Sequence, residues 1–296
     1  MTAVSIEPRC PSSLLKLAWA AHHLEELKPL ADAFEKGNPA EITSYFKPKR
    51  PGYDLVFQVV KETPNPIPLL TGDVIGCLRD ALDHLVYELT VAHSGEPARE
   101  HKTAFPVCEY RSQWPMRKSP TSRGINKTSG EWKVSGMHPK AQAKVRRLQP
   151  FYRKRRRGPH RKHPLWILDE LRNLDRHRRL NVTPLGPAKI ETTWTFHNSK
   201  IDILRTDSVR KLPKDGAVVE RVWLTPGAVK SDVSVKSTPT CKLAWDEPSA
   251  FQRQSPLIES LEAAIKWVGG LLADFYKFQP EAVQEFIKVG GTASRL

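Results

Sequence analysis

The stretch VIGCLRDALDHLVYEL, residues 74–89, decides how this chain folds. Leucine, isoleucine, valine and alanine recur in it every three or four residues, which is the repeat of an α-helix with one apolar face. The pattern continues on both sides and predicts a helix over about 69–92 that packs against other helices. Polar side chains share a second stripe beside the apolar face. This stripe consists of Asp73, Cys77, Asp80, His84 and Tyr87.

Further helices follow the same repeat elsewhere in the chain. They are expected over about 12–36, 139–148 and 163–182, and from Ser255-Pro256 onward. Residues 53–60 and 187–246 instead alternate apolar and polar side chains, with turn signals between the runs, which predicts antiparallel strands. The expected fold class is therefore α+β. A mainly α-helical bundle (1–186 and 250–290) carries an inserted antiparallel β-sheet (53–60 and 187–246) within one compact domain.

The composition of the 296-residue chain is typical of a folded globular protein, with 39% hydrophobic and 27% charged residues. No apolar run approaches the ~20 residues that a membrane-spanning helix needs, and the first residues do not have the pattern of a secretory signal. The four cysteines lie far apart and form no C-x-x-C motif, which argues against a disulfide scaffold or a cysteine-rich zinc site. We therefore expect a cytoplasmic protein with no membrane partner.

Positive charge is concentrated in one part of the chain. The net charge is +15, and residues 144–179 hold 14 lysines and arginines but only three acidic residues. The centre of this part is too charged to be buried, so we expect an exposed loop that binds RNA or another polyanion through phosphate contacts. There are two alternatives: the loop is solvated and has no partner, or it contacts an anionic membrane surface. The expected nucleic-acid-binding residues are Arg153, Lys154, Arg155, Arg156, Arg157, Arg161 and Lys162.

The helix expected over 163–182 also has a polar stripe. Asp175 and Arg178 lie on its apolar face, where a charge is costly unless it is paired or functional. In one interpretation the helix end extends into solvent, with Asp175 and Arg178 as a surface pair. In the other, His84 and His177 meet in a polar cavity between two helices. The polar stripe consists of His163, Trp166, Glu170, Asn173 and His177.

Both expected helices contain an arginine followed five positions later by a histidine. One copy is Arg79-Asp80-Ala81-Leu82-Asp83-His84, and the other is Arg172-Asn173-Leu174-Asp175-Arg176-His177. This arrangement resembles the R-x4-6-H signature of the HEPN superfamily, helical-bundle proteins that include many ribonucleases. The resemblance implies a metal-independent endoribonuclease, in which the histidine acts as general acid and base on the 2′-hydroxyl and the arginine binds the scissile phosphate. The polar residue after each arginine, Asp80 or Asn173, also fits that signature.

Helix geometry determines how such a site would form. Arginine and histidine five residues apart lie about 140° apart around a helix, so a second helix or a second chain has to complete the site. In the HEPN superfamily the second chain of a dimer commonly completes the site, so the resemblance implies a homodimer here. Within the first helix, Asp80 is expected to hydrogen-bond His84, and Arg79 to pair with Asp83. The expected catalytic residues are Arg79, Asp80, His84, Glu170, Asn173 and His177.

The same two stretches also resemble a set of bacterial hypothetical proteins, whose pattern lacks arginine at the position of Arg172. This second resemblance favours Arg79 and His84 as the pair, with His177 and Glu170 as partners, and implies no particular activity.

Other chemistries lack their motifs. No histidine follows a glutamate by three residues, as di-iron bundles require, and H-E-x-x-H, glycine-rich phosphate loops and G-x-S-x-G do not occur. We expect neither a metal nor a cofactor. Two classes of function remain open: an RNA-directed endoribonuclease, and a non-catalytic module that binds a polyanion or another protein.

Overall fold

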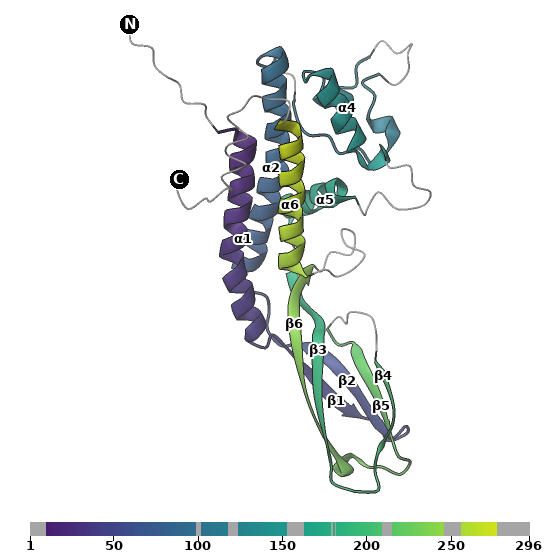
Figure 1. Cartoon of the computed structure of the whole chain (residues 1–296). Coiled ribbons are helices and arrows are strands. Elements are labelled where there is room, and N and C mark those ends of the chain that lie inside the picture. The colour runs from purple at the N-terminus through teal and green to yellow at the C-terminus, as the bar shows by residue number, and fades with distance from the viewer. Residues whose placement is uncertain are drawn as a thin grey trace, which may run out of the picture.

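Three long helices lie side by side and form the body of the molecule (Figure 1). The apolar stripe of residues 74–89 faces the other two helices, and Leu78, Leu82 and Leu85 are fully buried there. The sequence repeat therefore identified the core face of the bundle correctly. The three helices are α1 (Ser12–Lys36), α2 (Pro66–Ser94) and α6 (Leu257–Tyr276).

The computed structural model describes most of the chain. The described residues are 10–98, 102–117, 124–152, 163–178, 180, 182–208, 215–245 and 256–276, without the side chains of 183–188.

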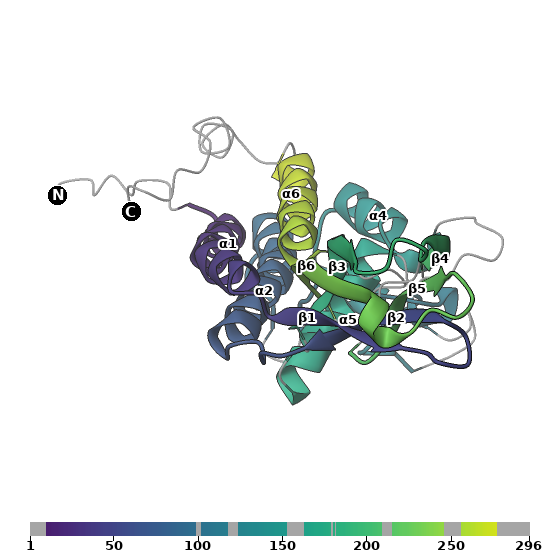
Figure 2. The ribbon, with the colours of Figure 1, turned by 90° about the horizontal axis from the view of Figure 1, so that it is seen from below.

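Shorter helices cover one side of this bundle. In both views α1 and α4 lie on opposite sides of α6 (Figure 1 and Figure 2). The Ser94 hydroxyl donates to the carbonyl of Gly136, at 2.7 Å, and so joins the end of α2 to the turn before α4. These elements are α3 (Gly130–Lys133), α4 (Pro139–Arg147) and α5 (Pro164–His177), with 3₁₀ turns η1 (Arg111–Gln113) and η2 (Pro150–Tyr152).

The strands form two antiparallel sheets at one end of the bundle (Figure 1). One has the strand order β1-β2-β5-β4, and the other is the pair β3-β6. A second apolar cluster, which includes Tyr53, Leu55, Phe57 and Val222, fills the space between them. The strands are β1 (Ala40–Phe46), β2 (Gly52–Val59), β3 (Val182–Phe196), β4 (Ile203–Ser208), β5 (Val218–Leu224) and β6 (Val233–Trp245), with η4 (Lys230–Asp232) before β6.

The predicted α+β class is confirmed, whereas parts of the predicted strand layout are wrong. The strands form two sheets instead of one, and β1 (Ala40–Phe46) lies outside the predicted strand ranges, whereas β4 (Ile203–Ser208) falls within the predicted range 187–246. The helix expected to end near residue 182 ends at His177, because Arg178 already has an extended backbone (φ −161°, ψ 157°). β3 consequently begins at Val182, five residues before the expected start of the sheet at residue 187.

No helix in the described part of the chain is long and apolar enough to cross a membrane.

Candidate functional site

Arg79 is held by three acceptors and is nearly buried. Its side chain is 11% exposed, and it lies between α2, α5 and the segment that contains Phe105. Nη1 lies 2.5 Å from a carboxylate oxygen of Asp83, Nε lies 3.0 Å from Asp169, and Nη2 donates to the carbonyl of Phe105 at 2.7 Å. The predicted pairing of Arg79 with Asp83 is confirmed. With its donors directed at these acceptors, this guanidinium acts as a link between elements.

His84 lies on a different side of α2 and faces α1. Its Nδ1 is 3.0 Å from the hydroxyl of Ser12, and that hydroxyl donates to Glu88 at 2.7 Å. The predicted hydrogen bond between Asp80 and His84 is wrong, because the Lys16 ammonium of α1 donates to the Asp80 carboxylate at 3.0 Å. A full opposite charge competes better for a carboxylate than a neutral imidazole does. Arg79 and His84 therefore do not converge on one site within a chain.

Glu88 joins α1, α2 and α6. Its carboxylate accepts from the backbone N–H of Ser13 at 3.1 Å, from the hydroxyl of Ser13 at 2.6 Å and from the phenol of Tyr276 at 2.9 Å. The carboxylate thus lies at the N-terminal end of α1, where the helix dipole favours negative charge. Burial, followed by the neighbouring Glu88 carboxylate, raises the pKa of the Tyr276 phenol, which stays protonated.

The set Ser12, His84 and Glu88 has the residue types of a hydrolase triad without its connectivity. In a triad the carboxylate orients the histidine, and the histidine takes the proton of the serine. Here the serine proton points to Glu88, so the imidazole cannot act as base toward Ser12 in this arrangement. Glu88 follows His84 by four residues, and this spacing is the one signal by which the sequence could have revealed the cluster.

The charged residues of α5 pack against two glycines of α2. An added Cβ at Gly76 would lie 3.3 Å from Arg172, and one at Gly72 would overlap the Asp175 carboxylate. Arg172 and Asp175 pair with each other at 3.3 Å, so the predicted surface pair of Asp175 with Arg178 is wrong. Burial, with a contribution from Asp73, raises the pKa of Asp175.

The remaining predicted residues of α5 form no contact with His84 in the described structure. Glu170 is half-buried, while Asn173 and His177 are exposed. α5 and α2 run in opposite directions where they touch, so His177 lies beyond the level of Gly72. His84 is twelve residues further along α2, about 18 Å at 1.5 Å per residue. The cavity predicted to hold His84 and His177 together is not formed within one chain.

The predicted nucleic-acid-binding residues Arg153, Lys154, Arg155, Arg156, Arg157, Arg161 and Lys162 lie outside the described residues.

α4, the helix that precedes residues 153–162 in sequence, has several exposed cations. α4 buries Ala141 and Val145 and exposes Lys140, Arg146 and Arg147, which we call the α4 cations. None of the α4 cations forms an ion pair within the described residues. Lys144 is different, because its Nζ donates to the carbonyl of Asp274 at 2.8 Å and lies 4.6 Å from the ring of Phe275, which fixes α4 to α6.

Two cysteines of the described residues are buried. Burial raises the pKa of the Cys108 and Cys241 thiols to about 11, so neither forms a thiolate at neutral pH. No group of three or more histidine, cysteine, aspartate or glutamate side chains could hold a metal ion in the part of the chain that the structure describes. No protein-family model, curated protein or solved structure matches this chain.

Proposed function

We propose that the protein binds RNA through the α4 cations and the basic segment that follows them in sequence. The observation that carries this proposal is the exposure of Lys140, Arg146 and Arg147 without ion-pair partners among the described residues. Cations that are not neutralised within the protein keep their field and can displace the counterions of a phosphate backbone. Residues 153–162 add seven more lysines and arginines and no acidic residue.

Binding without cleavage fits the predicted catalytic residues best. The donors of Arg79 are directed at protein acceptors, and His84 is hydrogen-bonded to Ser12. The Nε, Nη1 and Nη2 atoms of Arg79 and the Nδ1 atom of His84 thus have partners within the protein. Both therefore fit a structural role in the helix bundle.

The test is a salt titration of RNA binding with the double variant Arg146→Ser/Arg147→Ser. If each arginine contacts one phosphate of single-stranded RNA, the slope of log K against log salt should fall by about 1.4, at about 0.7 per contact. Folding should be unchanged, since both side chains are exposed. Lys200→Ser/Lys236→Ser, which removes two exposed cations near the sheets, is the matched control. An equal slope for wild type and the α4 double variant would remove α4 from the interface.

An endoribonuclease of the kind that the HEPN resemblance implies is the second candidate. What favours it is the exposed cluster Arg176, His177 and Arg178 at the end of α5, where a second chain could supply the missing group. The site would then lie between two copies and would use His177 as general acid and base.

Cleavage of RNA in excess chelator tests this second candidate. His177→Ala should lower the cleavage rate by about 10²- to 10⁴-fold, the usual contribution of a general acid or base, and leave RNA affinity nearly intact. Sedimentation should show a dimer in the active fraction. Cleavage that persists in purified His177→Ala protein would exclude this site, and a wild type that cleaves nothing would leave RNA binding as the function.

A further inference from the structure

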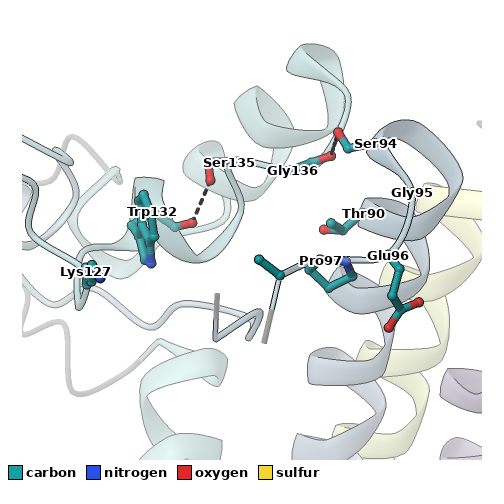
Figure 3. A pocket seen from close by; sticks show the side chains of 10 residues that line it. Thr90, Ser94, Gly95, Glu96, Pro97, Lys127, Trp132, Ser135 and Gly136 are labelled. Carbon is teal, nitrogen blue, oxygen red and sulfur yellow. Dashed lines mark hydrogen bonds between the residues drawn. The ribbon is translucent and has the colours of Figure 1, made fainter. Parts of the chain in front are cut away.

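A pocket of about 320 Å³ lies between the end of α2 and the turn that joins α3 to α4 (Figure 3). Trp132 and Lys127 line one side of it, and Thr90, Ser94 and Glu96 line the other. Hydrogen bonds fix both walls: Ser135 donates to the carbonyl of Trp132 at 3.0 Å, and Ser94 donates to that of Gly136 at 2.7 Å. These hydrogen bonds hold both walls of the pocket in place.

Thr90 gives this pocket an unsatisfied polar group. The residue is 2% exposed, and its hydroxyl has no hydrogen-bond partner among the described residues. Figure 3 shows the hydroxyl directed toward the pocket. Thr71 of the same helix is also buried, but its hydroxyl donates to the carbonyl of Ile67 at 2.7 Å. Leaving such a group unpaired costs roughly 1–3 kcal/mol, which a bound ligand with a hydrogen-bonding edge would recover.

Gly136 makes room for this arrangement. A Cβ at that position would overlap the methyl group of Thr90, so the turn can approach α2 only without a side chain there. The close approach places Trp132, which is half-buried, opposite Thr90. An indole on one wall and a hydroxyl on the other suit a flat ring that carries donors and acceptors at its edge.

The charges around the pocket separate the two ends of such a ligand. Glu96 lines the pocket, but Figure 3 shows its carboxylate directed away from Trp132, and Tyr87 donates to one of its oxygens at 2.6 Å. The negative charge of Glu96 still disfavours a phosphate close to it. Cations lie at the rim and beyond: Lys127 in the lining, and Lys133 and Lys140 next to the turn. The base of a nucleotide is thus favoured inside and its phosphates outside.

We propose that this pocket takes one unstacked nucleobase of single-stranded RNA, stacked on Trp132 and hydrogen-bonded by Thr90. This inference rests on the proposed RNA binding and names the form of RNA that it selects. Paired bases in a duplex cannot enter, so single strands should bind better than duplexes of the same sequence and length.

The test compares Trp132→Ala and Thr90→Val for a short fluorescein-labelled oligo(A) and for double-stranded RNA. Trp132→Ala should weaken oligo(A) binding roughly 5- to 150-fold, the effect of losing one stacked base. Thr90→Val should weaken it about 2- to 10-fold and should not lower the melting temperature, because it removes an unpaired buried hydroxyl. Duplex affinity should be unchanged in both. The matched controls are Trp19→Ala, an exposed tryptophan on α1, and Thr71→Val.

The outcomes separate this inference from the function on which it rests. Oligo(A) affinity that is equal in wild type and both pocket variants, while Arg146→Ser/Arg147→Ser still flattens the salt dependence, overturns the pocket and keeps RNA binding. A wild type that binds no RNA overturns the proposed function. In that case, titration with adenosine 5′-monophosphate tests the pocket. Quenching of tryptophan fluorescence that is present in wild type and missing in Trp132→Phe supports the pocket, and no difference between the two proteins overturns it.

Discussion

Gly52 occupies a point where two strands come too close for a side chain. Its φ of +154° is one that other residues rarely adopt, and an added Cβ would overlap the carbonyl oxygen of Val222 on β5. Gly52→Ala should therefore lower the free energy of unfolding by more than about 1 kcal/mol, because both the backbone angle and the strand pairing are disturbed. Urea denaturation monitored by circular dichroism measures this loss.

Gly270→Ala is the matched control for that substitution. Gly270 lies in α6, and no atom lies within 4 Å of an added Cβ. Alanine is the better helix former there, so this variant should gain up to about 1 kcal/mol. A Gly52→Ala protein as stable as wild type would show that β2 and β5 can separate locally without loss.

Single residues of the site were predictable only where their partners are local. Arg79 and Asp83 are four residues apart on one helix, and their ion pair followed from spacing alone. His84 meets Ser12, which is 72 positions away in sequence. The ion pair of Asp80 with Lys16 was not predicted, for the same reason. Helical periodicity shows on which face of its helix a residue lies, but not which other helix covers that face.

At the scale of elements, the three long helices depend on one carboxylate. Glu88 of α2 accepts from Ser12 and Ser13 of α1 and from Tyr276 of α6. Hydrogen bonds to a charged group contribute about 1.5–3 kcal/mol each, and their loss leaves the partners unpaired. Glu88→Ala should thus destabilise the protein by about 3 kcal/mol or more, while Glu88→Gln, which keeps one acceptor, should lose less.

Thermal unfolding of these variants beside Glu25→Ala checks the assignment. Glu25 is 68% exposed on α1 and pairs only with Lys28 in the described structure, so its removal should change stability by no more than about 1 kcal/mol. Similar melting temperatures for Glu88→Ala and Glu25→Ala would mean that the cluster does not hold the helices together.

Long helices were easier to predict than strands. Each of α1, α2 and α6 repeats its apolar residues over five or more turns, so isolated exceptions do not hide the period. β1 has seven residues and β4 has six, and β4 is largely exposed, which leaves little alternation to recognise. Their places are fixed by pairing with β2 and β5, a contact that no local pattern records.

At the scale of the molecule, some cations of the described residues are paired with carboxylates and others are not. At the sheet end, Arg50 pairs with Asp54 at 2.5 Å, and Arg205 pairs with Asp207 at 2.7 Å. At the other end of the bundle, the α4 cations have no such partners in the described part of the chain (Figure 1). Lys200 and Lys236 near the sheets are also exposed, but the α4 cations are followed in sequence by the seven further cations of residues 153–162. RNA is therefore expected to bind at the α4 cations and not on the outer face of the sheets.

The basic segment, residues 153–162, follows α4 in sequence, so its contribution should add to that of α4. Arg155→Ser/Arg156→Ser/Arg157→Ser should lower the slope of log K against log salt by about 2.1 for single-stranded RNA, at about 0.7 per phosphate contact. Combined with Arg146→Ser/Arg147→Ser, the two losses should sum, because contacts with different phosphates release separate counterions. Filter binding at several salt concentrations gives the slopes, with Lys200→Ser/Lys236→Ser as the control. A combined variant no weaker than the α4 double variant would mean that the segment does not reach the RNA, and that α4 and the Trp132 pocket form the whole contact.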